Sequence, residues 1–135
     1  MLEMKRLSAE GYFSFEDYEV YHLALDLSAQ VYRLTAGFPE VERFGLTNQL
    51  RRAANSIALN IAEGRGRGTD REFARFLLIS RGSLFEVVSG FHLAVRLVFL
   101  QEGEVREMFQ KAHTLSGKLS ALVHKLSALG SRPSA

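Results

Sequence analysis

Residues 104–129 read EVREMFQKAHTLSGKLSALVHKLSAL, and this stretch decides the fold. Its apolar residues recur at alternating steps of three and four, which places them along one face of an α-helix. An average spacing of 3.5 residues keeps such a seam against neighbouring helices that cross at a shallow angle. The seam comprises Val105, Met108, Ala112, Leu115, Leu119, Leu122, Leu126 and Leu129. We therefore expect a long helix in a helical bundle.

Three further helices are predicted upstream, over about residues 14–37, 46–63 and 70–100. The third carries its own seam, which comprises Phe73, Leu77, Ser80, Leu84, Val87, Phe91, Ala94 and Val98. Short connections between long helices favour antiparallel neighbours. The fold class expected is all-α, an antiparallel up-down four-helix bundle over residues 15–129. Residues 1–14 are expected to form a flexible N-terminal segment and residues 130–135 a flexible tail.

The expected helix boundaries rest on capping residues and glycines. Ser14 with Asp17, and Thr69 with Glu72, have the spacing of capping boxes that start the first and third helices. Three glycines in the GRGRG segment, residues 64–68, are expected to end the second helix. Gly103 is expected in the turn before the last helix.

Composition agrees with a single domain in a reducing compartment. The chain has 135 residues, of which 47% are hydrophobic, and this is enough for a core without disulfides or metals. It has no cysteine, so disulfides, thiolate zinc sites and thiol nucleophiles are excluded. Residues 1–14 lack the apolar run of a signal peptide, and no run of apolar residues reaches membrane-spanning length. We expect a cytoplasmic protein without a membrane segment.

The helix expected over residues 70–100 carries a second apolar line beside its seam. It comprises Leu78, Phe85, Val88, Val95 and Phe99, and Arg81 and His92 interrupt it. A bundle needs one wide apolar face per helix, so a second line indicates additional burial. It predicts an interface between subunits that includes Leu78, Phe85, Val88 and Phe99. The alternative is that this helix is the central helix of a monomer.

The second helix carries a line of small and polar residues beside its apolar face. These are Gln49, Ala53, Ser56, Asn60 and Glu63. Small residues allow close approach of backbones, and the polar ones can form hydrogen bonds across the contact. Gln49, Ser56, Asn60 and Glu63 are therefore candidates for the same oligomer interface, although a solvated helix flank would have the same composition.

Positive charge is concentrated between Arg43 and Arg81. This region holds eight arginines and three acidic residues, a net charge of +5, whereas the whole chain has +2. The candidates for binding a phosphate backbone are Arg51, Arg52, Arg65, Arg67, Arg71 and Arg75. The alternative is that these arginines pair with Glu63, Asp70, Glu72 or acids of a neighbouring subunit.

No pattern of catalytic or metal-binding residues is present in the sequence. Glu19 and His22 have the Glu-x-x-His spacing of di-iron helical bundles, but no second copy of this motif exists. The GRGRG segment follows a helix rather than a strand and lacks the Gly-Lys-Ser/Thr ending of a phosphate loop. We therefore expect no catalytic residues, no metal, no cofactor and no enzymatic activity.

Several blocks of the sequence resemble the bacterial family named for the 23S rRNA intervening sequence. They include Phe15–Tyr21, Phe38-Pro39, Glu42–Ala54, Asn60–Gly64 and Gly82–Leu84. The resemblance covers about Phe15 to Val98. It implies a four-helix bundle assembled into a ring, a homopentamer, and a relationship to accessory proteins of diversity-generating retroelements, which work with a reverse transcriptase and bind nucleic acid.

The sequence departs from this family at two places. Ala58 stands where relatives often have proline, and residues 85–88, Phe-Glu-Val-Val, replace a more acidic pattern. The leading functional hypothesis is a non-enzymatic, ring-forming protein that binds RNA or DNA electrostatically through its arginines. The alternative is an oligomeric scaffold for a protein partner without direct nucleic-acid contact.

Overall fold

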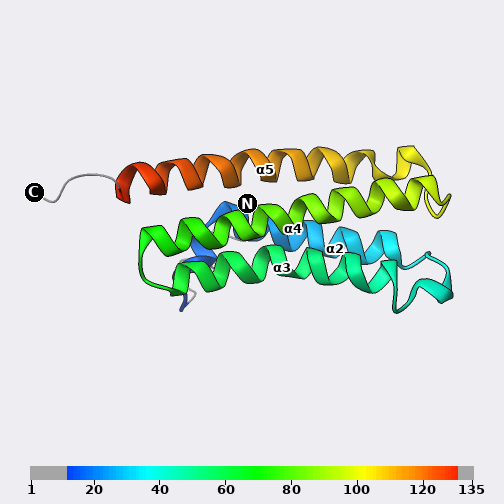
Figure 1. Ribbon diagram of the computed structural model, residues 1–135, viewed down its shortest axis with the longest axis horizontal. Helices are drawn as coiled ribbons and strands as arrows, with labels where there is room; N and C mark the ends of the chain where they lie inside the picture. Colours follow the sequence, from blue (N-terminus) through cyan, green and yellow to red (C-terminus); the bar gives the residue numbers. More distant parts are fainter. Residues whose placement is uncertain (1–11, 131–135) are drawn as a thin grey trace, which may run out of the picture.

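Four long antiparallel helices make up the structure, a computed structural model that describes residues 12–130 (Figure 1). The helices are α2 (Glu19–Thr35), α3 (Leu46–Gly66), α4 (Asp70–Arg96) and α5 (Glu102–Gly130), with short 3-10 turns η1 (Ser14–Asp17) and η2 (Glu40–Glu42). No strand occurs in the described range. The predicted all-α four-helix bundle is confirmed. The expected flexible ends lie mostly outside the described residues.

The predicted seams form the core. Val105, Met108, Ala112, Leu115, Leu119 and Leu126 of α5 are buried, and Leu122 is half-buried. On α4 the seam from Phe73 to Ala94 is buried throughout. By length and composition α4 could cross a membrane, but core helices of bundles commonly pass the same test. Here its most apolar face is used for packing within the bundle.

The start of the first helix was predicted wrongly. Ser14 begins the turn η1 and not the helix, and α2 starts only at Glu19 after Tyr18 adopts an extended conformation. The reason is aromatic packing, because the ring of Phe15 contacts Tyr21 at 4.9 Å and the ring of Tyr18 contacts Phe73 at 5.2 Å. These contacts turn the chain before the helix can begin.

The end of the second helix was also predicted too early. Helix α3 continues to Gly66, and the chain leaves the helix only near Gly68, which has a positive φ of 92°. Gly64 is a close-packing residue rather than a helix breaker, since it lies buried against Phe73 and Phe76. The cap at Thr69 is as predicted, with its Oγ1 accepting a hydrogen bond from the backbone N–H of Glu72 at 3.1 Å.

Helix α4 ends earlier than predicted, at Arg96. The N–H of Phe99 donates to the carbonyl of Ala94 at 2.9 Å, and the N–H of Val98 donates to that of Val95 at 3.0 Å. This is the Schellman pattern, which places Val98 in the left-handed conformation with a φ of 63°. Val98 is therefore 76% exposed and lies outside the seam. Gly103 lies inside α5, so its predicted place in the turn was wrong.

Candidate interaction surfaces

Two of the four arginines around the α3–α4 turn are paired with neighbouring acids. The Arg67 guanidinium is 2.6 Å from the Glu63 carboxylate, and Arg75 donates two hydrogen bonds to the Glu72 carboxylate at 2.9 and 3.2 Å. Both guanidinium groups also lie over the ring of Phe76, at 5.1 and 4.6 Å from its centroid. Arg67 and Arg75 thus make contacts within the chain on either side of the turn.

The same pairing shifts the ionisation of its members. The hydrogen bond from Arg75 lowers the pKa of the Glu72 carboxyl, with smaller contributions from the charges of Arg75, Arg67 and Arg71. In return, Glu72 raises the pKa of Arg75. Both groups are exposed to solvent, so this ion pair mainly orients side chains and stabilises the protein only slightly.

Two other arginines of this turn have no ion-pair partner among residues 12–130. Arg71 is exposed and has no hydrogen-bond or ion-pair partner within residues 12–130. Arg65 is half-buried, and its Nε is buried without a partner in the same range. Residues 63–75 together hold four arginines and three acids, so the net charge at the turn is only +1.

Arg51 and Arg52, adjacent in sequence, have different environments. Arg51 donates from Nε to Oγ1 of Thr35 at 2.9 Å, and its guanidinium lies 4.6 Å from the centre of the Tyr32 ring. It therefore connects α3 to the end of α2. Arg52 is exposed and has no partner among the described residues. It precedes Arg65 by about 20 Å along the helix, so the structure does not join the two arginine groups.

The polar line of α3 is used partly within the chain. The hydroxyls of Ser56 and Ser83 share a hydrogen bond of 2.9 Å, and Nδ2 of Asn60 donates to Oγ of Ser56 at 2.8 Å. Glu63 is occupied by Arg67. Gln49 is exposed and lines a shallow groove between α3 and α4 together with Arg52. Part of this line therefore holds α4 against α3.

The second apolar line of α4 divides into covered and exposed members. Phe99 packs against Phe38 with ring centres 5.4 Å apart, so its own chain covers part of it. Val88 is half-buried near α5. Leu78 and Phe85 remain 42% and 56% exposed. These two are the members of the line that stay available for a partner.

The outer surface of α4 carries a strip that the sequence reading did not single out as a unit. It consists of Leu78, Gly82, Phe85, Ser89 and Leu93, which we call the α4 strip. Leu93 is 49% exposed, and a Cβ added at Gly82 would meet no atom within 4 Å. The steps of four, three, four and four were visible in the sequence. The strip was not predicted because glycine and serine are not counted as apolar residues.

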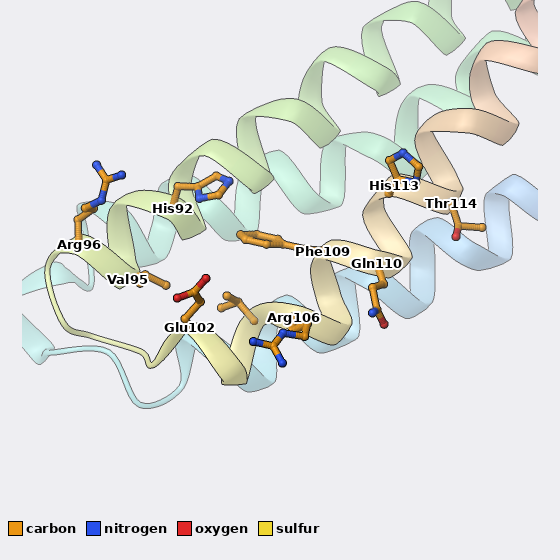
Figure 2. A pocket seen from close by; sticks show the side chains of 10 residues that line it. His92, Val95, Arg96, Glu102, Arg106, Phe109, Gln110, His113 and Thr114 are labelled. Carbon is orange, nitrogen blue, oxygen red and sulfur yellow. The ribbon is translucent and has the colours of Figure 1, made fainter.

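A second surface feature is a groove between α4 and α5 (Figure 2). It has a volume of about 670 Å³ and runs toward the turn that joins these helices. Figure 2 shows His92 of α4 beside Phe109 of α5, and their ring centres are 4.7 Å apart. Sequence analysis could not find this groove, because it exists only where the two helices meet.

The Glu19 and His22 pair is used for contacts within the chain. Glu19 forms an ion pair with Lys118 at 3.0 Å, and Nε2 of His22 donates to the backbone carbonyl of Glu16 at 2.8 Å. Within the described part of the chain, no group of three or more acidic or histidine side chains is placed to hold a metal ion.

Comparison with known proteins agrees with the fold. The profile of a family described as 23S rRNA-intervening sequence protein matches residues 16–121. A search among curated proteins found no match. The matched region begins in η1, includes all of α2, α3 and α4, and extends through most of α5. The chain therefore belongs to the family of 23S rRNA-intervening sequence proteins.

Proposed function

We propose that the protein is a non-enzymatic, self-associating helical scaffold of the cytoplasm, and that its copies meet through the α4 strip. The observation that carries this proposal is the exposure of Phe85 at 56%, between Leu78 and Leu93 on the same face. Scattered single apolar residues on a surface are ordinary. Three large ones in a row on one long helix are typical of a contact surface.

The residues between the large side chains support close packing of a second helix. Gly82 and Ser89 alternate with Leu78, Phe85 and Leu93 along the strip. Small side chains leave room for the ridges of a facing helix. If the strip meets a different surface of the next copy, repetition of the contact closes a ring, and a homopentamer is the assembly that the family resemblance implies.

Mass measurement in solution tests the proposal directly. We expect the wild-type chain to be oligomeric at micromolar concentration by light scattering coupled to size exclusion. Gly82→Leu should weaken or abolish the oligomer, because the leucine side chain occupies the space of the facing helix. A monomeric wild-type protein would refute the proposal.

Gly117→Leu is the matched control. Gly117 also lies within a helix, and a Cβ there would also meet no atom within 4 Å. Both variants exchange an exposed helical glycine for leucine, so their effects on the isolated bundle should be equal. Equal loss of the oligomer in both would contradict a specific role of the α4 strip.

Nucleic-acid binding is the second candidate function. Arg52 and Arg71 are exposed cations without partners in the described range, and both can reach a phosphate backbone. Because Glu63 and Glu72 occupy Arg67 and Arg75, we expect weak binding by a single chain. Assembly would multiply these sites and raise the overall affinity. An accessory role for another protein, such as a reverse transcriptase, would use the same assembly without direct contact to nucleic acid.

A further inference from the structure

The groove between α4 and α5 has two chemically different ends. One end is mainly apolar and is lined by Leu84, Phe85, Val88, Phe109 and Ala112. The other, which we call the polar end, carries the side chains of Arg96, Glu102, Arg106, Gln110 and Thr114 beside apolar residues such as Val95 and Val105. His92, Phe109 and His113 line both ends. The two ends therefore adjoin at these shared residues, with an apolar part on one side and a polar part on the other.

The polar end has an excess of positive charge. Arg96, Arg106 and one acid, Glu102, line this end, and no ion pair joins any of the three within residues 12–130. His113 lies one helical turn beyond Phe109, and Arg106 lies one turn before it (Figure 2). A guanidinium and two imidazoles can each donate a hydrogen bond to a carboxylate. This end is complementary to a single negative charge.

The apolar end provides a surface for a hydrocarbon group. The ring of Phe109 is stacked at a tilt on His92, and Val88 is half-buried beside it. The hollow at the polar end has a volume of about 670 Å³ and that at the apolar end about 550 Å³, and both lie in the range of small-molecule sites, which is roughly 300–1,000 Å³. The groove therefore has the size as well as the polarity of a ligand site.

We infer that this groove binds a small amphiphilic monoanion, an alkyl or aryl carboxylate. Its hydrocarbon part lies against Val88 and Phe109, and its carboxylate lies near Arg106. The charge complementarity of the polar end selects the anion, and the apolar end selects the hydrocarbon. This site and the α4 strip share Phe85, which is the middle large residue of the strip and also lines the apolar end of the groove.

Titration calorimetry with three probes tests the inference on the full-length wild-type protein. Octanoate should bind with one site per chain, and octanol should bind more weakly because it lacks the charge. Butyrate should also bind more weakly, because each buried methylene contributes about two- to fourfold in affinity. Absence of octanoate binding would overturn the inference, and so would equal binding of octanol.

A pair of exposed charge variants locates the site. Arg106→Gln should weaken octanoate binding about tenfold, because it removes the charged partner of the carboxylate. Lys111→Gln is the control, since it removes one positive charge from the same helix outside the groove, where Lys111 pairs with Glu107. Equal weakening in both variants, or none in Arg106→Gln, would overturn the placement of the carboxylate.

Discussion

The backbone of Gly64 packs against Phe76 so closely that a Cβ on residue 64 would lie 2.5 Å from Cβ of Phe76. This contact joins α3 to α4 beside the turn between them. We expect Gly64→Ala to lower the free energy of unfolding by about 1–3 kcal/mol, because the added methyl forces the helices apart. The measurement is urea denaturation followed by circular dichroism.

Gly66→Ala is the control for this prediction. Gly66 is the last residue of α3, and a Cβ there would meet no atom within 4 Å. Its replacement should leave the stability unchanged or raise it slightly, because alanine favours the helix more than glycine does. Equal destabilisation by both substitutions would show that the contact with Phe76 is not the cause.

The left-handed conformation of Val98 offers a stabilising substitution. A β-branched residue at a φ of 63° is strained, whereas glycine adopts this conformation at no steric cost. Val98→Gly should therefore raise the free energy of unfolding by about 1 kcal/mol. Val41→Gly, at an exposed valine without a positive φ, should not raise the stability. A gain in both variants, or in neither, would contradict the assigned strain.

The different environments of Arg51 and Arg52 predict different effects on stability. Arg51→Gln should cost about 1–2 kcal/mol, since it removes the hydrogen bond to Thr35 and the contact with the Tyr32 ring. Arg52→Gln should change the free energy of unfolding by less than about 0.5 kcal/mol, as is usual for an exposed site. Thermal and urea unfolding of the two variants, measured side by side, test this prediction. A larger loss of stability in Arg52→Gln than in Arg51→Gln would contradict it.

The ion pair between Glu72 and Arg75 predicts a shifted titration. The pKa of the Glu72 carboxyl, followed through the NMR chemical shift of its carboxyl carbon, should lie below the usual range of glutamate, because Arg75 lowers it. A lowered pKa in the folded state stabilises the protein above the pKa of the unfolded chain. This stabilisation is lost as the pH falls through the lowered value. Arg75→Gln should move the titration back up, and an unchanged midpoint would exclude this cause.

Binding of nucleic acid should depend on Arg52 and Arg71 more than on other cations. Each substitution by glutamine should reduce the slope of log affinity against log salt concentration by about 1. Lys111→Gln, which removes a charge already paired with Glu107, should change the slope less. Fluorescence anisotropy with a labelled RNA at low salt measures this. If the wild-type protein does not bind under these conditions, the second candidate function is excluded.

Much of the fold could be predicted because burial repeats along a helix. The seam of α5 and the seam of α4 up to Ala94 follow from apolar spacing alone, and Thr69 follows from local capping chemistry. Two of the errors, at the start of α2 and the end of α3, occurred where a contact between helices overrides the local signal. Phe73 holds Tyr18 away from the helix, and Phe76 gives Gly64 a packing role. Neither partner is near in sequence.

The candidate site residues were less predictable than the helices. Charge and spacing identify the arginines and the acids three or four residues away that pair with Arg67 and Arg75, but a partner on another helix cannot be read from spacing. Arg51 is engaged by Thr35, whereas Arg52 is free of partners in the described range. The role of Leu78, Phe85 and the other proposed interface residues stays a prediction, to be tested by the mass of the assembly.

The sequence by itself determined that four amphipathic helices form and which face of each is buried, because both depend on periodicities of a few residues. The tertiary structure decided which arginine contacts a neighbouring helix, how α3 and α4 approach at Gly64, and where α4 and α5 leave a groove. These features depend on pairs of side chains brought together by packing. Both members of each pair are present in the amino-acid sequence, but only the packing of the helices brings them into contact.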